Sequence, residues 1–187
     1  MSPSRVIAFL READWLNGER ARIYSTMIAA ALAIMFAWIL VSALTIYHNA
    51  QAFGGDFASF YAASKLALSG HAADAWRPDI HGAVEAHLFA TPQGYLAFFY
   101  PPPYLLTCWP FALLPYPLAL FTWIVATLSA AIGAVRLFFR ETTPHIQIGI
   151  VAMLAFPGVW INLGCGQNGA LILAILALGF AWLDRRP

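Results

Sequence analysis

Three long stretches of the chain carry apolar residues with no charged residue among them. No Asp, Glu, Lys or Arg occurs in residues 23–55, 86–135 or 142–183. A helix in a soluble fold needs polar residues on its outward face, so these stretches predict helices whose solvent is lipid. Composition agrees, because 61% of residues are apolar and 10% are charged, against about 45–50% and about 25% in soluble domains. We therefore predict an all-α integral membrane protein.

The apolar stretches divide into about four predicted transmembrane helices. The first contains 22 residues and would rise about 33 Å as a helix, enough to cross a hydrocarbon core of ~30 Å. The last stretch is broken at Pro157-Gly158 and again by a Gly-rich turn around residues 162–169, which predicts short helices on either side of a tight turn. The predicted crossings are residues 26–47, 118–139, 145–162 and 168–183.

Charged residues predict how these helices are oriented. Residues 1–25 are polar and rich in arginine, which predicts a cytoplasmic N-terminal segment followed by an uncleaved signal anchor. Residues 48–117 form a polar-containing loop, predicted to be extracytoplasmic and to carry juxtamembrane helices, one of them over 56–69. If residues 100–117 do not cross, eight of the ten Lys and Arg residues lie in the cytoplasm. If they do cross, the split is four against six, which the positive-inside rule disfavours.

The composition also limits the possible ligands. A net charge of +1 gives no indication of a nucleic-acid partner. The two cysteines and the histidines have no zinc-ligand spacing, so we expect no metal site and no tightly held cofactor. Asp74 and Asp79 flank Arg77 and predict a local ion pair rather than a catalytic pair.

Asp56 is the first candidate for chemistry. It follows Gly54-Gly55 at the junction between the first crossing and the loop helix, where an ionisable group needs a task or a partner. Two structural explanations stay open, since Asp caps helices well and can also simply be solvated.

Gln167 and Asn168 are the second candidates. They lie in a Gly-flanked turn at a helix start, which suits an anion, although a plain turn with a capping Asn is an alternative. The short helices around this turn would place it below the outer surface, facing a polar hollow on the same side as Asp56.

A set of ordered motifs resembles glycosyltransferase family 87. The motifs run from about Gly54 to Arg186, each weak alone but fairly specific as a series. They are Gly55-Asp56-Phe57, Phe60-Tyr61-Ala62-Ala63, Leu66-Ala67-Leu68-Ser69-Gly70, Ala73-Asp74-Ala75, Phe99-Tyr100-Pro101-Pro102, Leu113-Leu114-Pro115-Tyr116 and Gly166-Gln167-Asn168-Gly169.

The resemblance implies a fold of the GT-C type and a membrane hexosyltransferase of the bacterial plasma (inner) membrane. The family is associated with α-1,2-mannosyl transfer from a polyprenyl-phosphate-linked sugar donor to a lipid-linked or glycan acceptor on the extracytoplasmic face. Asp56 matches the family's acidic loop position and would be the general base of an inverting reaction. Tyr61, Tyr100, Gln167 and Asn168 are the implied substrate-binding residues.

The chain differs from the family in length, since members have roughly twice as many residues and about ten or more spans. We therefore expect an N-terminal portion that is inactive alone or completed by a C-terminal membrane chain. Two other hypotheses stay open: a non-catalytic membrane subunit or remnant that binds lipid or partner helices, and a small transporter with a site at the broken helices. The lack of charge inside the spans disfavours ion-coupled transport.

Overall fold

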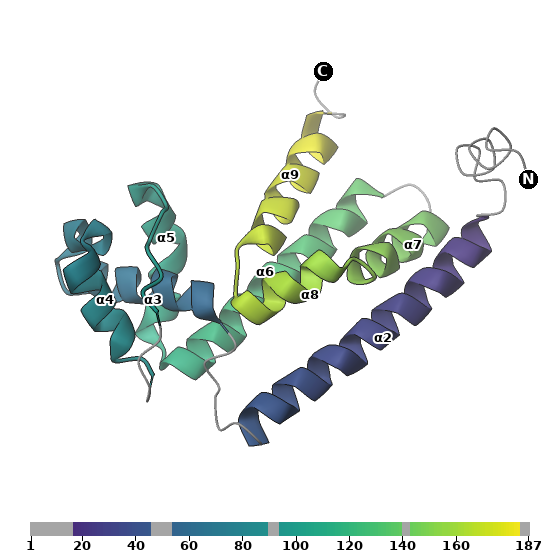
Figure 1. Cartoon of the computed structure of the whole chain (residues 1–187). Helices are drawn as coiled ribbons and strands as arrows, with labels where there is room; N and C mark the ends of the chain where they lie inside the picture. The colour runs from purple at the N-terminus through teal and green to yellow at the C-terminus, as the bar shows by residue number, and fades with distance from the viewer. Residues whose placement is uncertain (1–16, 46–53, 90–93, 140–142, 184–187) are drawn as a thin grey trace, which may run out of the picture.

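The described part of the protein is entirely helical (Figure 1). The computed structural model describes residues 17–45, 54–89, 94–139 and 143–183, and no strand occurs in these ranges. This agrees with the predicted all-α class. The elements in chain order are α2 (Gly18–Thr45), α3 (Gly55–Leu68), η2 (Ala72–Trp76), α4 (Pro78–Ala86), η3 (Pro102–Tyr104), α5 (Leu105–Cys108), η4 (Phe111–Leu113), α6 (Tyr116–Phe138), α7 (Thr143–Leu154), α8 (Pro157–Cys165) and α9 (Gly169–Leu183).

Two described helices, α2 and α6, are long and apolar enough to cross a membrane. A third candidate exists if α7 and α8 are counted as one broken span, and α9 is a shorter apolar helix of 15 residues. The helix α2 begins at Gly18, eight residues before the predicted first crossing. This earlier start is explained by an N-cap, because the Asn17 side chain accepts a hydrogen bond from the Arg20 N–H at 2.9 Å.

The predicted crossing over 145–162 consists of two helices with a bend of 60° between them, at the break predicted from Pro157-Gly158. Pro157 has no N–H to continue the helix and forces Phe156 into an extended conformation with ψ 118°. The break frees backbone carbonyls that lipid cannot satisfy. The indole N–H of Trp160 donates to one of them, Leu154 O, at 2.8 Å.

Small residues let α9 pack closely along α6. Ala131 and Ala134 of α6 and Ala170 and Ala174 of α9 are buried, as expected for helices that associate by close backbone approach rather than by a hydrophobic driving force. The helix α2 packs against α7 and α8. Its other faces are lined with exposed apolar side chains, which suits contact with lipid.

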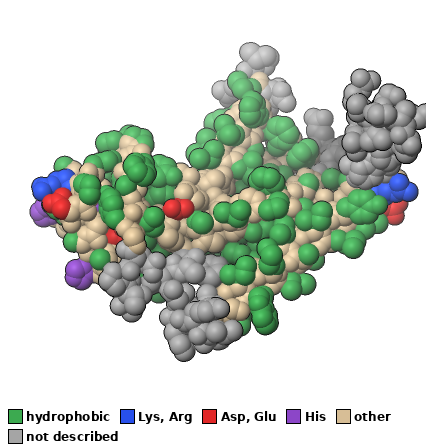
Figure 2. All heavy atoms as spheres, in the orientation of Figure 1, with side chains coloured by type: hydrophobic (Ala, Val, Ile, Leu, Met, Phe, Trp, Pro, Cys, Tyr) green, Lys and Arg blue, Asp and Glu red, His purple; other side chains and the backbone are tan. Residues whose placement is uncertain are grey.

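The short helices form a cluster at one end of the molecule, with α3 packed against α4, η2 and α5. Its aromatic core includes Phe57, Phe60 and Phe98, and Trp123 of α6 joins the same core. Most charged side chains on the face drawn in Figure 2 lie at the two ends of the molecule, with apolar surface between them. None of the elements η3, α5 and η4, which lie within residues 102–113, is long enough to cross a membrane.

Candidate functional site: a carboxylate and an amide between two glycine turns

Two glycine turns meet where α3 begins and α8 ends. Gly54 has φ 76° and Gly166 has φ 68°, both in the left-handed region that favours glycine. The Gly54 N–H donates to Gly164 O at 2.7 Å. A Cβ on Gly166 would lie 3.3 Å from Gly54 Cα and 2.6 Å from Phe57 Cβ. The backbones therefore touch, and this contact places Asp56 beside Gln167.

Asp56 and Gln167 form a direct hydrogen bond. Gln167 Nε2 donates to Asp56 Oδ2 at 2.8 Å, across 111 positions of sequence. The other end of the amide, Oε1, accepts from the Tyr100 hydroxyl at 3.3 Å and from the Asn168 N–H at 3.4 Å. Because two donors face Oε1, the hydrogen-bond network fixes the amide with its Nε2 group toward the carboxylate.

The contacts of Asp56 differ from those of a helix cap. The N-cap of α3 is Gly54, and α3 receives no side-chain cap hydrogen bond. In the described ranges, Asp56 has no Lys or Arg within ion-pair distance, and its Oδ1 atom has no hydrogen-bond donor. The carboxylate lies in the first turn of α3, where the helix dipole favours negative charge. Arg77 instead pairs with Asp74 at 3.6 Å and Asp79 at 3.1 Å, so the predicted local ion pair is confirmed.

Tyr100 belongs to an aromatic wall beside the pair. Its ring stacks on Tyr104 with centroids 4.3 Å apart, and Phe60 meets it edge-on at 5.0 Å. Burial, and secondarily the charge of Asp56, raise the pKa of the Tyr100 hydroxyl, so it remains a donor toward Gln167. The sequence analysis did not select Tyr104, which belongs to this wall because its ring stacks on Tyr100. Its hydroxyl is buried and has no hydrogen-bond partner in the part of the chain that the structure describes.

Tyr61, also predicted to bind substrate, has a different set of contacts. Its side chain is 5% exposed, and its hydroxyl donates to Leu114 O at 2.8 Å. The ring packs against Phe57 and Tyr116. The structure therefore does not bring Tyr61 into hydrogen-bond contact with the Asp56–Gln167 pair, whereas it does bring Tyr100 and Asn168 there.

Two residues of α6 hold the glycine turns, and the sequence reasoning did not select either. The Trp123 indole N–H donates to Gly166 O at 2.9 Å, and the Tyr116 hydroxyl donates to Gly54 O at 2.8 Å. Trp123 is 1% exposed. The two residues are seven positions apart and so lie on one face of the helix. That spacing of two hydrogen-bonding aromatic residues in an apolar helix was the available signal.

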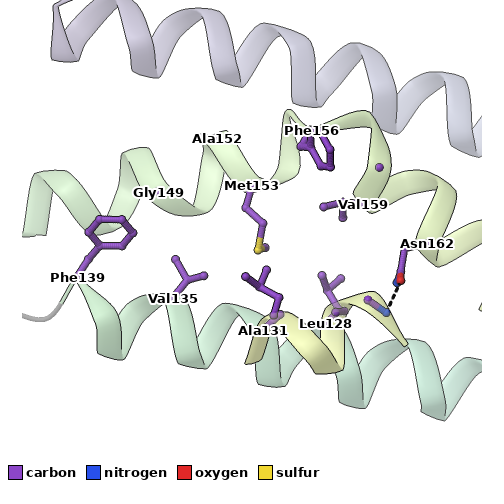
Figure 3. Close-up of a pocket in the computed structure, with 14 residues that line it drawn as sticks. Leu128, Ala131, Val135, Phe139, Gly149, Ala152, Met153, Phe156, Val159 and Asn162 are labelled. Atoms are coloured by element: carbon purple, nitrogen blue, oxygen red, sulfur yellow. Dashed lines mark hydrogen bonds between the residues drawn. The ribbon is translucent and has the colours of Figure 1, made fainter. Parts of the chain in front are cut away.

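An apolar cavity of about 600 Å³ lies between α6, α7, α8 and α9. Its walls include Leu128, Val135 and Met153, whose side chains point into the space drawn in Figure 3. Asn162 lies at one end, with its Oδ1 accepting the Gly169 N–H at 2.7 Å. The cavity therefore reaches the turn that carries Gln167. Across the described residues, no group of three His, Cys, Asp or Glu side chains could hold a metal ion.

The fold and the site together define a helical membrane protein with a carboxylate–amide pair beside an apolar cavity. Comparison with known families identifies the class more closely: residues 98–187 match the family model of glycosyltransferase family 87. The match implies a GT-C-type glycosyltransferase, and the resemblance is confirmed over this range. The motifs between Gly55 and Ala75 lie outside the matched range. Searches of curated proteins and of solved structures gave no match.

Proposed function

We propose that the chain acts in a membrane hexosyltransferase that moves a sugar, mannose by the association of its family, from a polyprenyl-phosphate donor to a lipid-linked or glycan acceptor. The observation that supports this best is the Asp56–Gln167 hydrogen bond of 2.8 Å. It joins the predicted catalytic carboxylate to a turn inside the family 87 domain. In this proposal the helices cross the membrane four times, with both turns toward the extracytoplasmic face.

The geometry supports Asp56 as the general base. Gln167 occupies one carboxylate oxygen and fixes the orientation of the group, while Oδ1 has no donor among the described residues. An acceptor hydroxyl within about 2.6–3.2 Å of Oδ1 could lose its proton to it as the hydroxyl oxygen attacks the anomeric carbon. The anomeric centre would invert, and the lipid phosphate would leave. Gln167 acts as a positioning residue in this scheme.

The apolar cavity supports a lipid-linked donor. An isoprenoid chain has no hydrogen-bonding groups, and the lining has the same character except for Asn162, whose Oδ1 is already engaged. The cavity ends at the turn that carries Gln167 and Asn168. A chain lying there would bring its phosphate toward the backbone N–H groups at the start of α9. Donor and acceptor would then meet at Asp56.

Sugar transfer by the full chain in membrane vesicles, from polyprenyl-phosphate-[³H]mannose, tests the proposal. Asp56→Asn keeps an oxygen that can accept from Gln167 but removes the base, so we expect transfer to fall by about 10²–10⁴-fold. Asp79→Asn is the matched control, because Asp79 is an exposed carboxylate of the same loop cluster, and it should transfer at the wild-type rate. Transfer retained by Asp56→Asn would exclude Asp56 as the base. Because the chain is expected to be inactive alone or completed by a C-terminal membrane chain, the vesicles are prepared from native membranes that contain any such chain. Native vesicles that release no label to any acceptor would contradict the enzyme assignment.

A further inference from the structure

The helix α4 buries two ionisable side chains on one face. His81 is 0% exposed and Glu85 is 5% exposed, and they lie one turn apart. His81 Nε2–H donates to Ser59 O of α3 at 3.0 Å. Asp79 of the same helix faces solvent, as a carboxylate usually does. The inward position of Glu85 therefore calls for a partner.

Only one of the two carboxylate oxygens of Glu85 has a hydrogen-bond donor among the described residues. Oε2 accepts the Leu96 N–H at 3.0 Å. Oε1 is buried and has no hydrogen-bond partner among the residues described. A buried carboxylate oxygen without a donor is uncommon, because its desolvation is uncompensated. A ligand that supplies one hydroxyl donor would complete it.

Glu85 forms part of the wall of a cavity of about 180 Å³. That is on the order of six water molecules, each occupying about 30 Å³. Phe89 and Tyr95 supply two aromatic rings to the same wall, and Tyr95 is 42% exposed, so the cavity adjoins the surface. Gly82 lets the Tyr95 ring lie close, since a Cβ there would be 3.1 Å from Tyr95 Cδ2.

The cavity is linked to the Asp56 turn by one aromatic side chain. Phe89 packs edge-on against Tyr116 with centroids 5.4 Å apart. The Tyr116 hydroxyl in turn holds Gly54 O at 2.8 Å, two residues before Asp56. A ligand in the cavity would therefore lie in the same loop cluster as the carboxylate proposed to activate the acceptor.

We propose that this cavity is a subsite for a hexopyranose unit of the acceptor, with Glu85 Oε1 accepting from a ring hydroxyl and the Tyr95 and Phe89 rings packing on the sugar's C–H face. The inference rests on the proposed function. A purely apolar ligand would leave Oε1 without a donor. A divalent cation requires several oxygen ligands, and Glu85 is the only carboxylate in the described lining.

Saturation-transfer NMR on the full chain in lipid nanodiscs tests the subsite, with methyl α-D-mannopyranoside as the probe. Methoxycyclohexane, a ring without hydroxyl groups, is the control ligand and should bind more weakly. Glu85→Gln should weaken binding of the mannoside by about tenfold or more, the ratio expected when a hydrogen bond to a charged group is lost. Gly82→Ala should weaken it as well, because its Cβ would lie 3.1 Å from Tyr95 Cδ2 and displace that ring from its place in the wall while leaving Glu85 intact. Asp79→Asn should bind as wild type does.

Wild-type affinity in both Glu85→Gln and Gly82→Ala would overturn the subsite, as would a wild-type chain that does not bind the mannoside. Either result is what ordered water alone in the cavity would give. Asp56→Asn separates this inference from the proposed function. It should lose sugar transfer yet bind the mannoside normally, so failure of the subsite and failure of the base appear in different measurements.

Discussion

Replacing Gly166 by Ala should separate the two glycine turns and dismantle the Asp56–Gln167 pair. Two costs add at this position. A left-handed φ of 68° is unfavourable for Ala, by roughly 1–2 kcal/mol. The new Cβ would also lie 2.6 Å from Phe57 Cβ and 3.0 Å from Leu120 Cδ1, and such overpacking costs about 1–3 kcal/mol. The expected loss in the free energy of unfolding is therefore about 2–5 kcal/mol.

Two other glycines divide this cost into its parts. Gly70 has φ 85° but a Cβ there would meet nothing within 4 Å, so Gly70→Ala should pay only the backbone cost of roughly 1–2 kcal/mol. Gly133, inside α6, has neither a positive φ nor a close neighbour. Gly133→Ala should be as stable as wild type or more stable by up to about 1 kcal/mol, since Ala is the better helix former.

Reversible SDS titration of the three variants in bicelles, followed by circular dichroism, measures these differences. The expected order of stability is Gly133→Ala, then Gly70→Ala, then Gly166→Ala. The side-chain amide NMR signal of Gln167 should shift only in Gly166→Ala. Equal stability of Gly166→Ala and Gly70→Ala, with that signal unmoved, would refute the contact between the turns.

The remaining predictions concern the hydrogen-bond network and the buried residues of α4. Tyr100→Phe leaves Gln167 Oε1 with a single donor, so it should lower the free energy of unfolding by about 0.5–1.5 kcal/mol and slow sugar transfer. Tyr104→Phe removes a hydroxyl without a partner among the described residues and should not lower stability. A larger loss of stability in Tyr104→Phe than in Tyr100→Phe, measured by SDS titration, would contradict the network. Burial lowers the pKa of His81 from 6.5 and raises that of Glu85 from 4.5. As the pH falls, the His81 shift therefore lowers the free energy of unfolding and the Glu85 shift raises it. Glu85→Gln should therefore lose stability as pH falls below 6.5, and His81→Asn should lose it as pH rises from 4.5; opposite slopes in the unfolding midpoint would exclude these shifts.

The elements that the sequence predicted well are those set by local composition. The charge-free stretches indicated apolar helices, and the loop helix expected over 56–69 is α3, Gly55–Leu68. The expectation that Asp56 and Gln167 face the same hollow came from charge placement and from helices too short to span. In the structure these two side chains are hydrogen-bonded. The first inference used the composition of single segments, and the second used the distribution of charge along the whole chain together with helix length.

The features that the sequence did not predict depend on which face of an apolar helix meets protein. Trp123 and Tyr116 lie in a helix whose every face is apolar, so hydrophobic periodicity could not separate the residues that hold the turns from those that meet lipid. Only the seven-residue spacing of two aromatic residues with hydrogen-bond donors distinguished them. Tyr61 was selected from a motif, but its hydroxyl donates to Leu114 O, a partner 53 positions away. The buried Glu85 carboxylate likewise accepts a hydrogen bond from Leu96, 11 positions away. At the helix break before Pro157, the Trp160 indole donates to Leu154 O.

The 111 residues between Asp56 and Gln167 set a delay during biogenesis. At about 5–20 residues per second, a ribosome needs roughly 6–22 s to pass from one codon to the other. During this interval the nascent chain holds Asp56 without the amide that orients its carboxylate. The hydrogen-bonded pair can form only after α8 and the turn that carries Gln167 have been synthesised.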